Sequence, residues 1–368
     1  MTENNISSVQ INNRRKHLDE IAILRALAMF AVVAIHFINI PMFRIPEASS
    51  AQVFYYYFQK LLIFAVPCFI FISGLMVSYK QPQGKLNTKA FYIKRLKKVG
   101  VPYSLWTLFY LMVLIVLGAL SLSDLLNLQN WAIWLGFGKA YEHLYFMIII
   151  LEFYLLAPIL LPLAQKTAES LPWSLVIALG GQMVVYWLNR LFIYDYFPYI
   201  TTTYLWYWAV GFMGLWFGVN YEKNLQALKK HKTAIIVIFI GAFLVYCGFN
   251  WPLYLQMAFD TFIYTGDLYF YILTTIGLLI LLCCKISSIN NDRIKKFIKW
   301  IGDYSYGIYL IHPLFTFAIR YVLRFENPIL WFFVTIIGVV LLSAFCGLLV
   351  QWLQKNKIIS IAFGNWPK

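Results

Sequence analysis

The stretch Ile21 to Ile40, which reads IAILRALAMFAVVAIHFINI, decides the fold class of this chain. About 20 apolar residues in α-helical conformation cross the hydrocarbon core of a bilayer, and this run has that length. Similar runs recur along all 368 residues, which are 61% hydrophobic and 12% charged, whereas soluble domains carry about 25% charged residues. The composition excludes soluble enzymes and nucleic-acid-binding proteins and predicts an all-α integral membrane protein.

The apolar runs predict a bundle of about ten transmembrane helices. Their expected bounds are Ile21 to Ile40, Leu61 to Tyr79, Val99 to Leu120, His143 to Leu161, Trp173 to Tyr194, Tyr204 to Val219, Thr233 to Phe249, Tyr269 to Cys284, Tyr304 to Val322 and Ile329 to Leu353. Residues 1–17 form a polar N-terminal segment, and residues 18–368 form one membrane domain. The first apolar run lacks a following cleavage site of small residues, so we expect a retained helix rather than a signal peptide.

The distribution of charge predicts the orientation of the bundle. The chain has 30 Lys and Arg against 15 Asp and Glu, which gives a formal net charge of +15. On the proposed inner side, basic residues outnumber those on the outer side by about four to one, as in cytoplasmic connections. Both termini are therefore expected in the cytoplasm, and membrane topology accounts for the charge without a nucleic-acid partner.

Two local patterns carry structural expectations. Apolar residues at helical spacing from Ile294 to Ile301, interleaved with lysines, predict a short helix that lies on the inner membrane surface. All five cysteines lie inside apolar runs, which favours small core side chains over a disulfide framework or a zinc site. No metal site is expected.

Ionisable residues inside membrane spans are the first candidates for function because they are costly to place there. Arg25 and His36 lie 11 residues apart on the first span, so they share one helix face about 16 Å apart. Such a pair can mark a channel with an anion-binding end and a general base. Taken alone, a snorkelling arginine and a hydrogen-bonded histidine explain the pair better.

The fourth span adds His143 near its outer end and Glu152 nine residues deeper. Nine residues turn a regular helix by about 900°, which places the two side chains on opposite faces. A carboxylate at this depth must be paired, protonated or hydrated. Its simplest partner is Arg25 or a histidine, in a structural ion pair or a catalytic one.

In the ninth span, Tyr309 to Pro313 surround a further histidine, His312. Pro313 cannot donate to the carbonyl of Tyr309, so we expect a kink and a freed polar group beside His312. This histidine either lines a cavity or satisfies the freed backbone, and the two interpretations are equally weighted.

Two further segments complete the candidates. Ser73 and Gly74 in the second span permit close helix packing, which explains them without a binding role. Arg95 and Lys98 belong to a dense cationic segment that anchors the inner mouth. Since they are three residues apart on one helical face, they also suit the phosphates of a nucleotide-like donor.

Together these segments resemble the acyltransferase 3 family of membrane acyltransferases, which has an Arg-x10-His motif. The resemblance rests on Arg25 and His36, on Pro67 to Gly74, on Arg95 to Tyr103, on His143 to Pro158 and on Tyr304 to Pro313. The motifs follow the family order over nearly the whole chain, and ten spans are typical of the family. Tyr145 and Lys98 depart from its commoner Trp and Arg. The size and the loop 220–222 are also similar to the intercellular adhesion protein C-like subgroup.

The resemblance implies transfer of an acyl group, acetyl or succinyl, from cytoplasmic acyl-CoA to a hydroxyl of an extracytoplasmic glycan or lipid-linked sugar. It implies a bacterial plasma membrane protein whose partners are membrane lipids, acyl-CoA, the glycan acceptor and a glycan synthase or exporter, with no permanently bound cofactor. By this analogy the roles are catalytic for His36, Arg25 and Glu152, donor-binding for Arg95, Lys98, Ser73 and Gly74, and substrate-binding or supporting for His143, His312 and Tyr309.

A second hypothesis is a component that exports a polysaccharide without acyl transfer, with Arg25, Glu152 and His312 along its pathway. Many transporters have internal repeats and paired broken helices, and the sequence shows neither. Dependence on CoA distinguishes the two hypotheses.

Overall fold

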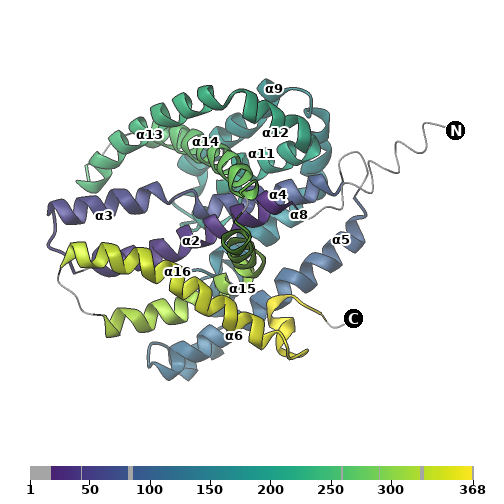
Figure 1. Cartoon of the computed structure of the whole chain (residues 1–368). Coiled ribbons are helices and arrows are strands. Elements are labelled where there is room, and N and C mark those ends of the chain that lie inside the picture. Colours follow the sequence, from purple (N-terminus) through teal and green to yellow (C-terminus); the bar gives the residue numbers. More distant parts are fainter. Residues whose placement is uncertain are drawn as a thin grey trace.

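The fold is described by a computed structural model that covers residues 18–42, 44–81, 86–257, 260–289, 291–323 and 327–366. The polar N-terminal segment 1–17 lies outside the described residues. The described part is helical and contains no strand (Figure 1). The all-α prediction is therefore confirmed.

In the part of the chain that the structure describes, eight helical stretches are long and apolar enough to cross a membrane, in agreement with a multi-pass protein. Several of these stretches consist of two or more consecutive helices. They are α2 (Asp19–Met42), α3 and α4 (Ser50–Leu61 and Ala65–Tyr79), α5, η1 and α6 (Thr88–Arg95, Leu96–Gly100 and Val101–Val116), α8 (Tyr145–Lys166), α9 to η4 (Leu171–Leu175, Val176–Gly180, Gly181–Leu188 and Asn189–Ile193), α13 (Lys232–Tyr254), α14 (Thr261–Ser287) and α16 (Pro328–Leu353).

The other two expected spans correspond to helices of unusual length. The helix α11 (Trp208–Val219) has 12 residues, about 18 Å of rise, and Ala209 to Val219 are all buried in protein. The helix α15 (Asp292–Val322) has 31 residues. The separate interfacial helix expected near Ile294 to Ile301 is thus wrong, because this amphipathic stretch continues directly into the predicted ninth span.

Shorter helices fill the connections between these elements. They are η2 (Leu122–Leu126), α7 (Leu128–Gly136), η5 (Ile200–Thr202), η6 (Tyr204–Tyr207), α12 (Tyr221–Lys230) and η7 (Ile359–Phe363). Polar side chains cap the starts of several helices: Asn87, Asn291 and Asn327 each accept a hydrogen bond from a backbone N–H of the first turn. Such N-caps contribute about 1 kcal/mol each.

The centre of the bundle is α2, whose side chains are buried on nearly all sides (Figure 1). Its neighbour α15 approaches closely because Gly302 lies directly against the Ala22 carbonyl oxygen. A second close pair joins α4 to α11, where Gly74 faces Gly211 and Gly214 faces Phe71. Small residues permit this approach of helix backbones in membranes, where packing rather than hydrophobic exclusion drives association.

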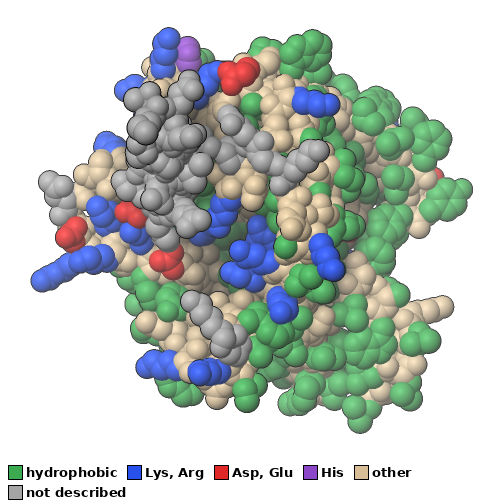
Figure 2. All heavy atoms as spheres, turned by 90° about the vertical axis from the view of Figure 1, so that its right-hand side faces the viewer, with side chains coloured by type: hydrophobic (Ala, Val, Ile, Leu, Met, Phe, Trp, Pro, Cys, Tyr) green, Lys and Arg blue, Asp and Glu red, His purple; other side chains and the backbone are tan. Residues whose placement is uncertain are grey.

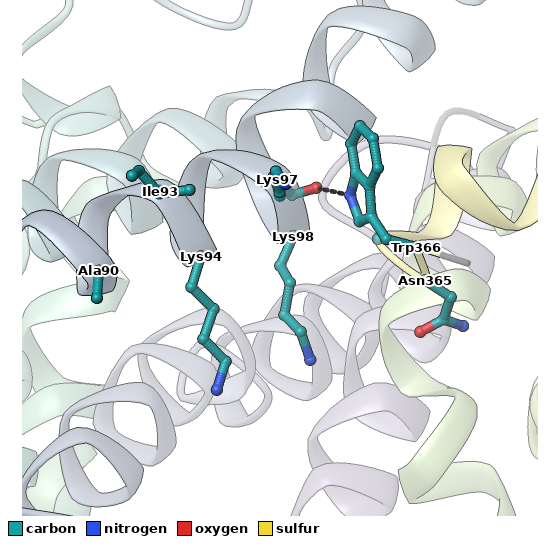
Figure 3. Close-up of a pocket in the computed structure, with 8 residues that line it drawn as sticks. Ala90, Ile93, Lys94, Lys97, Lys98, Asn365 and Trp366 are labelled. Carbon is teal, nitrogen blue, oxygen red and sulfur yellow. Dashed lines mark hydrogen bonds between the residues drawn. The ribbon is translucent and has the colours of Figure 1, made fainter. Parts of the chain in front are cut away.

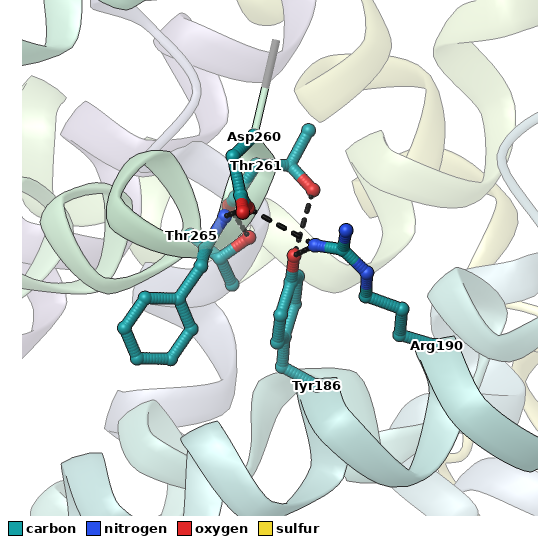
Figure 4. Close-up of polar contacts among 6 residues, drawn as sticks. Tyr186, Arg190, Asp260, Thr261 and Thr265 are labelled. Atoms are coloured by element: carbon teal, nitrogen blue, oxygen red, sulfur yellow. Dashed lines mark hydrogen bonds and ion pairs between the residues drawn. The ribbon is translucent and has the colours of Figure 1, made fainter.

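Helix α13 lies at the periphery of the bundle (Figure 1). Apolar side chains of α13 and α10, such as Val237, Leu244 and Val184, are exposed on the protein surface, as lipid-facing side chains would be. Arg190, in η4, ties α10 to the start of α14 (Figure 4). Its guanidinium donates to the Tyr186 hydroxyl at 2.9 Å and to Asp260 at 3.0 Å. Asp260 also caps α14, since its Oδ1 accepts from the N–H of Phe262.

Both described ends of the chain lie on one side of the bundle, as an even number of spans requires (Figure 1). Lysine and arginine side chains gather on that face (Figure 2). This arrangement agrees with the charge bias in the sequence. That this face is the cytoplasmic one stays a prediction of the positive-inside rule.

The Gly302 contact predicts a specific sensitivity. We expect Gly302→Ala to destabilise the protein by about 1–3 kcal/mol, because the added Cβ atom overlaps the Ala22 carbonyl and forces α15 away from α2. Gly241→Ala in α13 is the matched control, since nothing lies within 4 Å of its added Cβ atom. The midpoint of thermal unfolding in detergent measures both, and equal midpoints would contradict the packing described.

Candidate functional site

Three histidines from separate parts of the chain meet in the bundle. His36 comes from α2, His143 from the turn before α8 and His312 from α15. The ring centroids of His36 and His312 are 5.0 Å apart, and those of His143 and His312 are 6.0 Å apart. His143 and His312 are buried, whereas the His36 side chain keeps 17% of its surface exposed. This cluster brings together three of the residues expected from the sequence.

His312 satisfies the backbone and faces the cluster at the same time. Its Nδ1 lies 2.9 Å from the Tyr309 carbonyl, which Pro313 leaves without an N–H partner, and 3.1 Å from the Ile308 carbonyl. Since a carbonyl only accepts, Nδ1 carries the proton and Nε2 is the acceptor nitrogen. Nε2 is buried and has no hydrogen-bond partner among the described residues. The interpretation that His312 satisfies the freed backbone is therefore confirmed, while His312 itself lines neither of the cavities described below.

His36 lies beside a carboxylate that the sequence analysis did not single out. Its Nδ1 is 3.6 Å from Oε1 of Glu142, in the loop before α8. The contact with His36, with Arg320 adding to it, holds the pKa of Glu142 below its ordinary value, although the Glu142 side chain is 65% exposed. An ionised Glu142 favours a proton on Nδ1 and leaves Nε2 of His36 as the basic nitrogen. The signal for Glu142 was its place directly before His143.

His36 and Glu142 line a hollow of about 90 Å³, which we call the outer hollow. Asn39, Thr316 and Arg320 line it with His36 and Glu142. The C-terminal end of α15 is fixed at this level by Arg44, whose guanidinium donates to the Arg320 and Leu323 carbonyls. The hollow thus places polar groups around the more exposed edge of the histidine cluster.

Tyrosines enclose His143 on its buried side. The rings of Tyr110 and Tyr309 have centroids 4.9 and 5.3 Å from that of His143. The Tyr309 hydroxyl donates to the His143 carbonyl, and the Tyr110 hydroxyl donates to the Leu310 carbonyl at 2.7 Å. Neither ring nitrogen of His143 has a hydrogen-bond partner within the described part of the chain. The cage fixes the ring and leaves its polar atoms available.

On the other side of Tyr309 lies an inner cavity of about 220 Å³. Its cationic lining consists of Arg25, Lys80 and Arg95, and Ser73 contributes a hydroxyl. Burial lowers the pKa of Lys80, and the nearby charges, Arg95 foremost, lower it further. Three cations in a cavity of this size favour an anionic ligand.

Aromatic rings hold Arg95 at the wall of the inner cavity. Its guanidinium carbon lies 4.2 Å from the Tyr154 ring centroid and 5.0 Å from that of Phe91. Its Nε is buried and has no partner among the residues that the structure describes. Its Nη1 donates to the Tyr154 hydroxyl at 3.4 Å. Stacking and this bond fix the plane of the guanidinium, and Nε stays available to a ligand.

The two cavities are connected by a continuous series of rings. Tyr309 lines the inner cavity and contacts His143 and His312, and His312 contacts His36 in the outer hollow. Arg25 and His36, which share one face of α2, thus lie at the two ends of this path. Tyr309 and His312 are buried and form the wall between the two cavities, one end of which is cationic while the other presents His36.

The structure does not bring all expected residues together. Oε2 of Glu152 accepts the backbone N–H of Tyr204 at 2.6 Å, so the expected partner, Arg25 or a histidine, is wrong. Its carboxylate caps the start of η6, where a non-α-helical backbone needs an acceptor. The predicted separation of Glu152 from His143 agrees with this placement.

Two donor-binding candidates also take other positions. Gly74 does not line the inner cavity but packs against α11, which agrees with the structural interpretation of this glycine. Lys98 lines a different hollow from Arg95. The reason is the π-helical turn η1 (Leu96–Gly100), whose wider hydrogen-bonding pattern changes the α-helical phase in which residues three apart share a face.

Comparison with known proteins found a family model and similar proteins that match this chain. The model of the acyltransferase 3 family, described as an acyltransferase domain, matches residues 18–348. A Staphylococcus epidermidis protein named "Probable poly-beta-1,6-N-acetyl-D-glucosamine export protein" is 25% identical over 364 residues, 96% of each chain. A Staphylococcus aureus (strain MRSA252) protein of the same name is 24% identical over 302 residues, 80% of this chain and 81% of that one. No solved structure matches significantly.

The similarity to bacterial membrane proteins and the eight apolar helices identify a multi-pass protein of the bacterial plasma membrane. The relatives also agree with the subgroup resemblance, since poly-N-acetylglucosamine export is the role that their names give.

The contact of Glu152 predicts that this residue stabilises the fold. We expect Glu152→Leu to lower the free energy of unfolding by about 1–3 kcal/mol, because the buried Tyr204 N–H then loses its acceptor. Glu152→Gln keeps an acceptor oxygen and is expected to retain most of the stability. Thermal unfolding in detergent compares the two variants, and equal losses would show that the charge, rather than the acceptor, is what matters.

Proposed function

The chain belongs to the acyltransferase 3 family, and from this premise we propose that it moves an acetyl or succinyl group from cytoplasmic acyl-CoA to a hydroxyl of an extracytoplasmic glycan or lipid-linked sugar. The observation that carries the proposal is the position of two groups at the ends of one series of contacting rings, Tyr309 and His312. The cationic inner cavity lies at one end, and the His36–Glu142 pair lies at the other. An acyl-CoA has anionic phosphates at one end and a thioester at the other, which matches the two ends of this path.

In the proposed reaction, Nε2 of His36 takes the proton from the acceptor hydroxyl while its oxygen attacks the thioester carbonyl carbon. The carbon–sulfur bond breaks, and the departing thiolate receives the proton from the imidazolium. Glu142 stabilises the positive charge that His36 carries between these steps. His143, with its unpartnered ring nitrogens, is a candidate donor to the carbonyl oxygen.

The donor end has a matching proposal. Arg25, Lys80 and Arg95 hold anionic groups of the donor at the inner cavity, and the Ser73 hydroxyl lies along the path. The Ser73 Oγ donates to the Phe69 carbonyl at 2.8 Å, so it retains its acceptor lone pairs for a ligand. Acyl-CoA acts here as a co-substrate and not as a resident cofactor.

The catalytic pair predicts a graded loss of activity. We expect His36→Ala to reduce transfer of labelled acyl groups in membrane vesicles by about 10²- to 10⁴-fold, since this is the usual contribution of a general base. Glu142→Gln should cause a smaller loss, because it removes only the charge that supports His36. Glu47→Gln, an exposed carboxylate outside the hollow, is the control. Transfer by His36→Ala at the rate of the unchanged protein would contradict the mechanism.

The donor cavity predicts protection by ligand. CoA or acetyl-CoA should raise the thermal midpoint of the purified protein, because a ligand that binds only the folded state stabilises it. Arg95→Ala should reduce this shift, and Arg293→Ala, an exposed cation outside the cavity, should leave it unchanged. An unchanged protein that CoA does not protect would count against an acyl-CoA donor.

Export of a polysaccharide is the second candidate function, and the names of the relatives favour it. It predicts that the amount of exported glycan depends on the protein while its acyl content does not. The same histidine variants separate the candidates, because a general base is needed for transfer and not for passage.

A further inference from the structure

A third hollow lies on the basic face, between the α5–η1 segment and the C-terminal tail (Figure 3). Its volume is about 580 Å³. Ile93, Lys94, Lys97 and Lys98 line it on one side, and the tail residues 364–366 line it on the other. Among the described residues, no carboxylate contributes to this lining. We call it the tail groove.

Specific contacts fix the tail against η1. The Trp366 indole N–H donates to the Lys97 carbonyl at 2.8 Å, and the Lys97 ammonium lies 5.3 Å from the centroid of the same indole. Gly364 has a φ of +75° and lies directly against the Lys98 carbonyl, a position that a larger residue would not fit. The Trp106 indole also donates to the Ala362 carbonyl at 2.9 Å. These contacts hold residues 364–366 in place as one wall of the tail groove.

The groove presents its charges in one direction. The side chains of Lys94 and Lys98 extend side by side, and the Asn365 amide lies near them (Figure 3). Two parallel ammonium groups beside an amide suit a phosphorylated ligand that also carries hydrogen-bonding atoms. The Trp366 indole adds an aromatic wall of the kind on which a nucleobase stacks.

The inner cavity is too small to hold a whole acyl-CoA molecule. Drug-sized ligands fill pockets of about 300–1,000 Å³, and acyl-CoA is larger than most of them. The inner cavity of about 220 Å³ therefore holds only part of it, and the rest must lie outside. Arg95 lines that cavity, while its sequence neighbours Lys94, Lys97 and Lys98 line the tail groove, so one segment forms a wall of both.

We propose that the tail groove binds the phosphorylated adenosine end of the donor, and that residues 364–366 complete this site. This inference rests on the proposed function and adds a binding element to it. The tail follows the part of the chain that the family model matches, residues 18–348, so this wall is argued from the present structure alone.

Binding of CoA and of pantetheine, which lacks the nucleotide, to the purified full-length protein in nanodiscs tests the proposal. Trp366→Ala and Lys94→Ala should each weaken CoA binding by about tenfold, the loss expected for one charge-assisted or stacking contact. Both variants should leave pantetheine binding unchanged. Trp366→Phe keeps the aromatic wall without the N–H and should retain most of the affinity. Trp352→Ala and Lys230→Ala, exposed side chains outside the groove, are the controls.

Three outcomes would overturn the proposal. CoA binding unaffected by Trp366→Ala and Lys94→Ala would remove the tail from the donor site and leave the proposed function intact. A loss seen only in nanodiscs with anionic phospholipid, and absent with zwitterionic lipid alone, would assign the groove to lipid headgroups. An unchanged protein that binds neither CoA nor pantetheine would overturn the proposed function as well.

Discussion

Where α15 packs against α2, Gly302 lies on the Ala22 carbonyl, and further along the same two helices His312 lies beside His36. The two contacts occur in the same order, so the helices run in the same direction. A backbone contact this close leaves little freedom to shift one helix along the other. The spacing of the histidines is therefore set by a glycine about 15 Å away along α15. The remaining parts of the site are arranged around this pair of helices.

The cost of burying polar groups explains several other features. Glu152 lies within an apolar helix because the irregular backbone before α11 needs an acceptor for the Tyr204 N–H. His312 accompanies Pro313 because the freed Tyr309 carbonyl needs a donor. In both places one polar side chain satisfies a backbone group that the helix cannot. At His312 the other ring nitrogen stays free for the cluster, whereas Glu152 lies apart from it.

The sequence was sufficient to predict the helical class, most of the spans and the placement of Arg25 and His36 at well-separated levels of α2, where they line two different cavities. Apolar runs and helical periodicity depend on local sequence, so these features could be predicted. The carboxylate beside His36 could not, because Glu142 lies in a loop and no periodicity shows which helix that loop contacts. The π-helical turn after Arg95 and the docking of the tail on Lys97 were missed for the same reason, since both depend on tertiary contacts.

We propose that this protein places an acyl group on a glycan outside the membrane and that His36 is the general base of the reaction. Mild alkaline release and mass spectrometry of cell-surface glycans measure this directly, in cells with the intact gene, a deletion, or His36→Ala. The account predicts that one specific acetyl or succinyl signal disappears equally in the deletion and in His36→Ala, while the variant protein still reaches the membrane. Unchanged acylation together with a fall in the amount of exported glycan would contradict the account and favour export.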